Sequence, residues 1–121
     1  MPRQILDESR IHPAIRDQVA SLNADIVKEV QDAVAANAVV VVGMRQNPMP
    51  RHARRILDND RIPYKYLEYG SYLSGWRRRN ALKMWTGWPT FPMVFVKGAL
   101  VGGAADLARL HASGELKRLL A

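Results

Sequence analysis

The spacing of apolar residues predicts two helices at the start of the chain. Ile11, Ile15 and Val19 recur at intervals of four, which places them on one face of a short helix. A second helix, capped by Asn23 or Asp25, is expected to follow and to end near residue 37. Its apolar face is formed by Ile26, Val27, Val30, Val34 and Ala35.

Residues 38–42 form an uninterrupted aliphatic run in which four of the five side chains are valines. Such a run predicts a strand that is buried on both faces of a sheet. Residues 43–50 break the pattern with glycine and two prolines, so they are expected to form a loop at the carboxyl end of that strand. Open α/β sheets bind ligands at this edge, which makes the loop the first candidate for a functional site. A helix is expected to begin at Pro50, with Ala53, Ile56 and Leu57 on its buried face.

A second strand and another helix are predicted in the middle of the chain. Residues 64–68 alternate in the manner of a strand. Ser74 is expected to cap the next helix, which runs to about Trp85. On this helix, Trp76 is expected to face the core and Arg79 the solvent.

The last third of the chain has the pattern of a hairpin followed by helix. Residues 93–96 and 100–101 are apolar and flank a short turn, and Leu107 and Leu110 lie on a helix after two glycines. The predicted order is therefore α-α-β-α-β-α-β-β-α. This order predicts an α/β domain with a four-stranded mixed sheet flanked by helices, the thioredoxin-like arrangement.

The chain contains 18 basic and 11 acidic residues, a formal net charge of +7, and no cysteine. The absence of cysteine excludes disulfides, thiolate nucleophiles and cysteine-ligated metal clusters. The positive charge favours anionic partners, but it does not distinguish nucleic acid from a small carboxylate. Since no run approaches the length of a membrane span and no signal peptide is visible at the start, we expect a cytoplasmic protein that does not enter a membrane.

The run Trp88-Pro89-Thr90-Phe91-Pro92 and the strand, hairpin and paired glycines after it resemble the glutaredoxins. The Trp-Pro-Thr opening is similar to the monothiol class, whose active site reads Cys-Gly-Phe-Ser. Upstream, residues 79–83 resemble the Arg-x-x-Leu-Lys helix of that class. The resemblance covers residues 25–121 and implies a glutaredoxin-like domain, preceded by a helical extension over residues 1–24.

The resemblance fails at the centre of the family's chemistry. Asn47-Pro48-Met49-Pro50 aligns with Cys-Gly-Phe-Ser, so Asn47 stands where the family has its nucleophilic cysteine. A carboxamide neither attacks a disulfide nor suits a soft iron–sulfur site. The chain is therefore expected to have no catalytic thiol, no thiol–disulfide oxidoreductase activity and no iron–sulfur cluster.

The glutathione site of the family is built mostly from cations and main chain, and much of it has a counterpart in this sequence. The resemblance implies a weakened site for glutathione or another small anion. In it, Arg45 and Arg79 would meet a carboxylate, Pro92 would be cis, and the main chain near Gly103 would receive a second carboxylate. The residues implied are Arg45, Arg79, Thr90, Phe91, Pro92, Gly103 and Ala104. Ala105 stands where many relatives carry a polar contact, which predicts weaker binding.

Three functions remain open at this stage. The first is a non-catalytic glutathione- or anion-binding regulatory or scaffold protein in redox or iron–sulfur biology, monomeric or weakly dimeric. The second is a glutathione-using enzyme whose chemistry does not involve a protein thiol. The third is a basic adaptor for an acidic protein or for nucleic acid. It would use the arginines of residues 51–55 and 77–79 if both helices present them on one side of the sheet.

Overall fold

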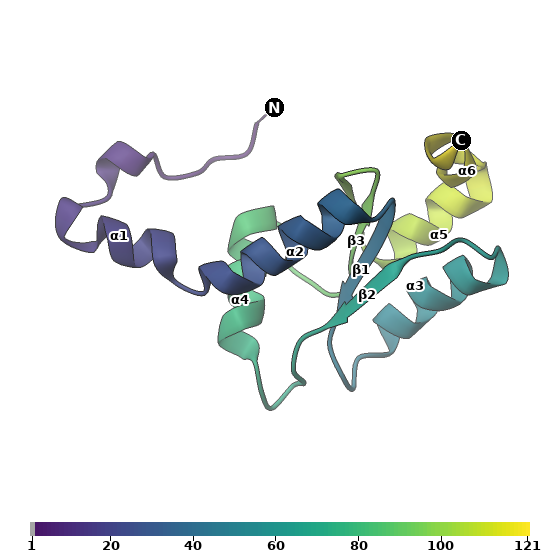
Figure 1. Ribbon diagram of the computed structural model, residues 1–121, viewed down its shortest axis with the longest axis horizontal. Coiled ribbons are helices and arrows are strands. Elements are labelled where there is room, and N and C mark those ends of the chain that lie inside the picture. The colour runs from purple at the N-terminus through teal and green to yellow at the C-terminus, as the bar shows by residue number, and fades with distance from the viewer. Residues whose placement is uncertain (1) are drawn as a thin grey trace.

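The computed structural model describes residues 2–121 and contains one four-stranded mixed sheet (Figure 1). The strand order is β2-β1-β3-β4. The strands are β1 (Val39–Gly43), β2 (Lys65–Glu68), β3 (Met93–Val96) and β4 (Ala99–Gly102). β2 is parallel to β1, whereas β3 is antiparallel to both β1 and β4. The order of elements along the chain confirms the predicted thioredoxin-like arrangement.

Helices cover both faces of the sheet. They are α1 (Pro13–Ser21), α2 (Ala24–Ala36), α3 (Pro48–Asn59), α4 (Trp76–Thr86), α5 (Ala104–Ser113) and α6 (Glu115–Leu120). A short 3-10 helix, Glu8–Arg10, precedes them. α2 and α4 pack on one face, and α3, α5 and α6 pack on the other. Within residues 2–121, no helix is long and apolar enough to span a bilayer.

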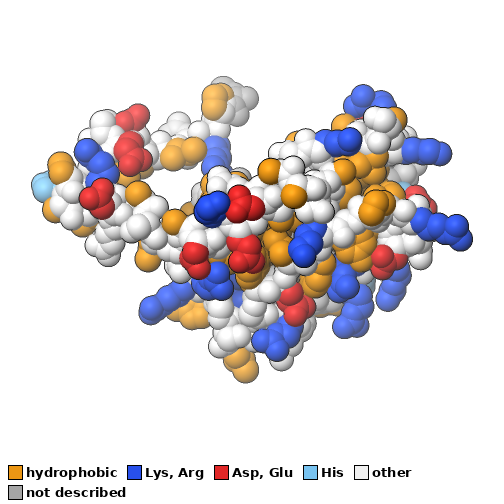
Figure 2. All heavy atoms as spheres, in the orientation of Figure 1, with side chains coloured by type: hydrophobic (Ala, Val, Ile, Leu, Met, Phe, Trp, Pro, Cys, Tyr) orange, Lys and Arg blue, Asp and Glu red, His pale blue; other side chains and the backbone are white. Residues whose placement is uncertain are grey.

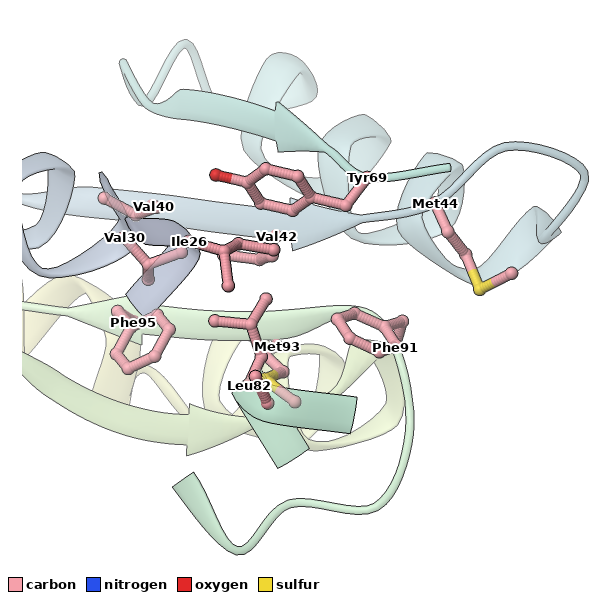
Figure 3. Close-up of a cluster of buried hydrophobic side chains, with 11 residues drawn as sticks. Ile26, Val30, Val40, Val42, Met44, Tyr69, Leu82, Phe91, Met93 and Phe95 are labelled. Atoms are coloured by element: carbon pink, nitrogen blue, oxygen red, sulfur yellow. The ribbon is translucent and has the colours of Figure 1, made fainter. Parts of the chain in front are cut away.

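The valines of β1 divide the core into two halves. Val40 and Val42 belong to the cluster under α2 and α4, which Figure 3 shows, whereas Val39 and Val41 belong to the cluster under α3 and α5. All four side chains are buried. The prediction of a central strand buried on both faces is therefore confirmed.

The segment before α2 packs loosely. α1 is helical as its spacing predicts, but its apolar stripe stays open, with Ile15 48% and Val19 50% exposed. In Figure 1, α1 stands apart from the sheet. A long-range hydrogen bond ties this segment to α4, from the guanidinium of Arg3 to the Trp85 carbonyl at 3.0 Å.

The start of α4 differs from the prediction. Ser74 does not cap the helix, because it pairs with Ser71 in a bridge across a tight loop, and Gly75 occupies the cap position instead. Gly75 has a φ of +73°, which turns the chain so that Trp76 points outward and is 54% exposed. Arg79, expected outside, is 6% exposed. The predicted orientations of Trp76 and Arg79 are therefore both wrong.

The start of α3 and the placement of the arginines also differ from what the sequence suggests. α3 begins at Pro48, two residues earlier than expected, because the side chain of Asn47 caps it. The condition for a single patch of α3 and α4 arginines is not met, because the two helices pack on opposite faces of the sheet. The basic side chains therefore form two separate groups.

Gly43, the last residue of β1, lies directly against the start of α3. A Cβ at this position would stand 2.8 Å from the Cβ of Pro50 and 2.9 Å from the hydroxyl of Tyr66. We expect Gly43→Ala to lower the free energy of unfolding by about 1–3 kcal/mol, because Pro50 cannot give way without a shift of the start of α3. Denaturant unfolding measures this. In a Tyr66→Phe background the cost should shrink but persist, and an unchanged stability in either background would contradict the packing argument.

Candidate functional site

A cleft of about 470 Å³ opens where the end of β1, the start of α3, the loop before β3 and the start of α5 meet. The structure brings six of the predicted site residues to its walls: Asn47, Thr90, Phe91, Pro92, Gly103 and Ala104. Figure 3 shows Met44 and Phe91 together at one end of the buried cluster, and both also line this cleft. The floor of the cleft therefore continues into the core and is held rigidly.

The peptide bond between Phe91 and Pro92 is cis, as the resemblance implies. Phe91 lines the cleft but is only 5% exposed, so its ring belongs to the core. Nearby, the indole nitrogen of Trp88 is buried and has no hydrogen-bond partner among residues 2–121. An unpaired indole N–H therefore lies close to the cis-proline segment on this side of the cleft.

Asn47 joins two walls of the cleft. Its carboxamide oxygen accepts a hydrogen bond from the main-chain N–H of Met49 at 2.9 Å. Its carboxamide nitrogen donates to the carbonyl of Phe91 at 3.1 Å. Asn47 therefore caps α3 and ties it to the cis-proline loop, with both ends of its amide in use.

The first turn of α3, residues 48–50, has no main-chain N–H left for an anion. The first turn of a helix normally offers unpaired N–H groups. Here, however, Pro48 and Pro50 have no N–H, and Asn47 takes the N–H of Met49. A thiolate that replaced the Asn47 side chain would find only the N–H of Met49 in the first turn, fewer hydrogen bonds than a helix N-terminus normally supplies.

The N-terminus of α5, across the cleft, has main-chain N–H groups available for a ligand. The N–H of Gly103 is paired with the Asp106 carboxylate at 2.9 Å, which fixes the helix start. The N–H groups of Ala104 and Ala105 belong to the first turn, where no helical carbonyl can reach them. Both residues line the cleft, so these two donors and the helix dipole favour an anion here.

The cations of the site differ from those that the sequence suggests. Arg79 points away from the cleft and donates from Nη1 to the carbonyls of Tyr69 at 3.0 Å and Ser74 at 2.6 Å. Arg45 is exposed on the turn after β1 and does not line the cleft. Lys83, one turn after Arg79 on α4, does line it. Its position four residues after a suspected cation was the signal that could have revealed it.

Two residues that the sequence reasoning did not single out also line the cleft. Tyr72 sits in the loop that Arg79 organises, and Met49 lies in the first turn of α3. They are 61% and 41% exposed. The mouth of the cleft is thus bordered by adaptable apolar surface, which suits a ligand with methylene groups between its charges.

Two tyrosines behind the cleft remain protonated at neutral pH. Burial, followed by a hydrogen bond to Glu68, raises the pKa of Tyr66 to about 12. Burial, followed by a hydrogen bond to Glu29 at 2.5 Å, raises the pKa of Tyr69 well above its ordinary value. Both phenols therefore act as hydrogen-bond donors that hold β2 and α2, and neither supplies a base to the cleft.

Comparisons with known proteins agree with this architecture. The sequence profile of the glutaredoxins matches residues 39–101. A glutaredoxin-like protein of Dictyostelium discoideum is 41% identical over 102 residues, covering 84% of this chain and 83% of that protein. The mitochondrial glutaredoxin-2 of Mus musculus is 33% identical over 94 residues, covering 78% of this chain but only 60% of the longer mouse protein.

Solved structures give the same result. The oxidized glutaredoxin 2 of Chlamydomonas reinhardtii is 30% identical, with a TM-score of 0.70 over 81% of this chain and 92% of that one. A buckwheat glutaredoxin in complex with glutathione is 25% identical, with a TM-score of 0.73 over 82% of this chain and 90% of that one.

Proposed function

The chain belongs to the glutaredoxin family, and we propose that it binds glutathione or a similar peptide anion without carrying out thiol–disulfide exchange. The observation that carries the proposal is the contrast between the two helix starts at the cleft. Asn47 and the prolines beside it leave the first turn of α3 without a nucleophile or a free main-chain N–H, whereas α5 keeps the N–H groups of Ala104 and Ala105. An anion site persists where the reactive centre does not.

The proposed ligand spans the cleft between two positive ends. One carboxylate would accept hydrogen bonds from the N–H groups of Ala104 and Ala105. The middle of the ligand would lie along the main chain of Phe91 and against Thr90. A second carboxylate would meet Lys83, with Arg45 as an outer cation. Because Ala105 offers no side-chain contact, we expect weaker binding than in a relative with a polar residue there.

Within the family, we propose that this chain derives from the monothiol class and acts as a regulatory or scaffold protein. The support is the likeness of residues 79–92 to the helix and Trp-Pro-Thr segment of that class. An iron–sulfur cluster does not fit the residues present at α3. The chain has no cysteine, and the carboxamide of Asn47 is held by two hydrogen bonds.

The test is a titration of reduced glutathione into isotope-labelled protein, followed by main-chain amide shifts. Saturable shifts are expected at Phe91, Gly103, Ala104 and Ala105. An absence of shifts at millimolar glutathione, or shifts confined to α6 at the other end of the molecule, would overturn the proposed site. A parallel titration with a neutral, amidated tripeptide of the same length should give much smaller shifts.

The contribution of Lys83 can be measured in the same titration. We expect Lys83→Ala to weaken glutathione binding about fivefold to tenfold, because one charge-assisted contact in a half-open cleft is lost. Arg77→Ala is the matched control, because it removes the same charge from the same helix at a residue that does not line the cleft. The Arg77 guanidinium lies 5.1 Å from the ring centroid of Trp76 instead. An equal loss of glutathione affinity in the two variants would mean that Lys83 contributes only nonspecific electrostatic attraction.

A further inference from the structure

A second groove, of about 410 Å³, runs between α3 and α5 beside the cleft. Its floor is formed by small or flexible apolar side chains, namely Met49, Ile56, Ala104, Ala105 and Ala108. Met49, Ala104 and Ala105 also line the cleft, so the two hollows are continuous. His52 and Arg55 stand along the α3 side of the groove.

The exposed side of α3 carries positive charge that the rest of the protein does not neutralise. Arg51, His52 and Arg55 are exposed, and none of them takes part in an ion pair among residues 2–121. None of the described residues that line the groove is acidic. Asp106, which lines the neighbouring cleft, is already bound to the N–H of Gly103 and to Arg109. Figure 2 shows Lys and Arg side chains gathered over the end of the molecule where α3 lies.

These charges oppose the stability of the helix that carries them. Arg51 and Arg55 are four residues apart, so like charges face each other on one side of α3. Arg51 also lies close to the N-terminus of the helix, where the dipole disfavours cations and where the first turn holds no acid. Arg54, between them, is used differently, because its guanidinium packs 4.1 Å from the ring centroid of Tyr66. The charge of Arg51 and Arg55 has no such internal use.

We propose that this groove is a docking site for an acidic segment of a partner protein. Small aliphatic side chains of the segment would pack on the alanine floor. Its carboxylates would pair with Arg55, which lines the groove, and with Arg51, one turn earlier on α3. Nucleic acid suits the groove less well, because its floor has no aromatic ring on which a base could stack. The other arginine group, on α4, lies on the opposite face of the sheet and cannot extend the surface into a track.

The test uses a fluorescent acidic peptide composed of Glu, Asp, Ala and Leu, added to the full chain. Saturable binding is expected, with amide shifts at Met49, Ala105 and Ala108. The double variant Arg51→Glu and Arg55→Glu should bind the peptide about tenfold more weakly or worse. The matched control is Arg77→Glu with Lys97→Glu, which makes the same change in net charge at two exposed positions outside the groove, and it should keep most of the affinity.

A steric variant separates the groove from general electrostatic attraction. Ala108→Phe fills the floor of the groove without changing the charge and should also weaken binding of the peptide. Far-UV circular dichroism checks that α5 remains helical in this variant. Three results would overturn the proposal. They are an equal loss in the control, unchanged binding in Ala108→Phe, or a single-stranded oligonucleotide that displaces the peptide from the same residues at lower concentration and with a steep salt dependence. The test is independent of glutathione, so its failure leaves the ligand site of the cleft unaffected.

Discussion

The Arg79→Ala variant is expected to unfold about 2–4 kcal/mol more easily than the parent protein. At a position only 6% exposed, the guanidinium binds the carbonyls of Tyr69 and Ser74. Removing it leaves both acceptors without their charged donor and opens a space inside the loop. Denaturant unfolding measures the loss. Arg78→Ala is the control, because the ion pair of Arg78 with Asp25 is exposed and should contribute less than about 1 kcal/mol.

The same variant separates two roles for Arg79. If Arg79 bound a ligand carboxylate directly, its removal would weaken ligand binding and leave the stability of the fold nearly unchanged. The structure instead makes it a positioning residue, because the loop that it holds carries Tyr72 to the mouth of the cleft. Arg79→Lys should recover only part of the stability, since the shorter lysine side chain places its ammonium short of the position from which Nη1 reaches both carbonyls. Equal, small losses for Arg78→Ala and Arg79→Ala would contradict this role.

The sheet and its central strand were predictable because their signals are local. A run of β-branched residues is buried on both faces wherever it lies in a sheet, and β1 follows that rule without exception. The segment Trp88-Pro89-Thr90-Phe91-Pro92 was recognisable as a family pattern, and its cis bond forms as that pattern implies. Both signals depend on residues adjacent in the chain.

The environment of Arg79 was not predictable because it depends on a loop closing around the side chain. Periodicity assigns a charged residue to the solvent side, since an isolated buried charge is costly. Here Gly70, with a φ of +65°, lets the loop turn so tightly that a Cβ would stand 2.8 Å from Nη1 of Arg79. Two carbonyls then converge on the guanidinium. No pattern on α4 alone contains that information.

The separation of the arginines on α3 and α4 has a topological cause. The chain leaves β1 for β2 on one side and then crosses back to β3 on the other side of β1. The two connecting helices pack on opposite faces of the sheet as a result. The order of elements along the sequence does not state the order of strands in the sheet, so charge counting alone could not assign the faces.

Restoring a thiol at the start of α3 is expected to give a poor nucleophile. In Asn47→Cys, the first turn of α3 offers only the N–H of Met49 to a thiolate, because Pro48 and Pro50 have none. The introduced thiol should therefore react with iodoacetamide at neutral pH little faster than an unstructured thiol. The parent chain, which has no cysteine, supplies a zero background.

Adding Pro48→Gly and Pro50→Ser to that variant returns two N–H donors to the first turn. We expect them to lower the pKa of the introduced thiol and to raise its alkylation rate about tenfold or more. Circular dichroism checks that α3 survives the loss of Pro50, which packs against Gly43. A fast-reacting thiol in the single variant would show that the two prolines do not limit its reactivity. The missing cysteine would then be the whole difference between this chain and its reactive relatives. An increase in alkylation rate only after both prolines are replaced would mean that the prolines at the start of α3 also prevent thiolate stabilisation. Restoring the cysteine alone would then not restore a reactive thiol.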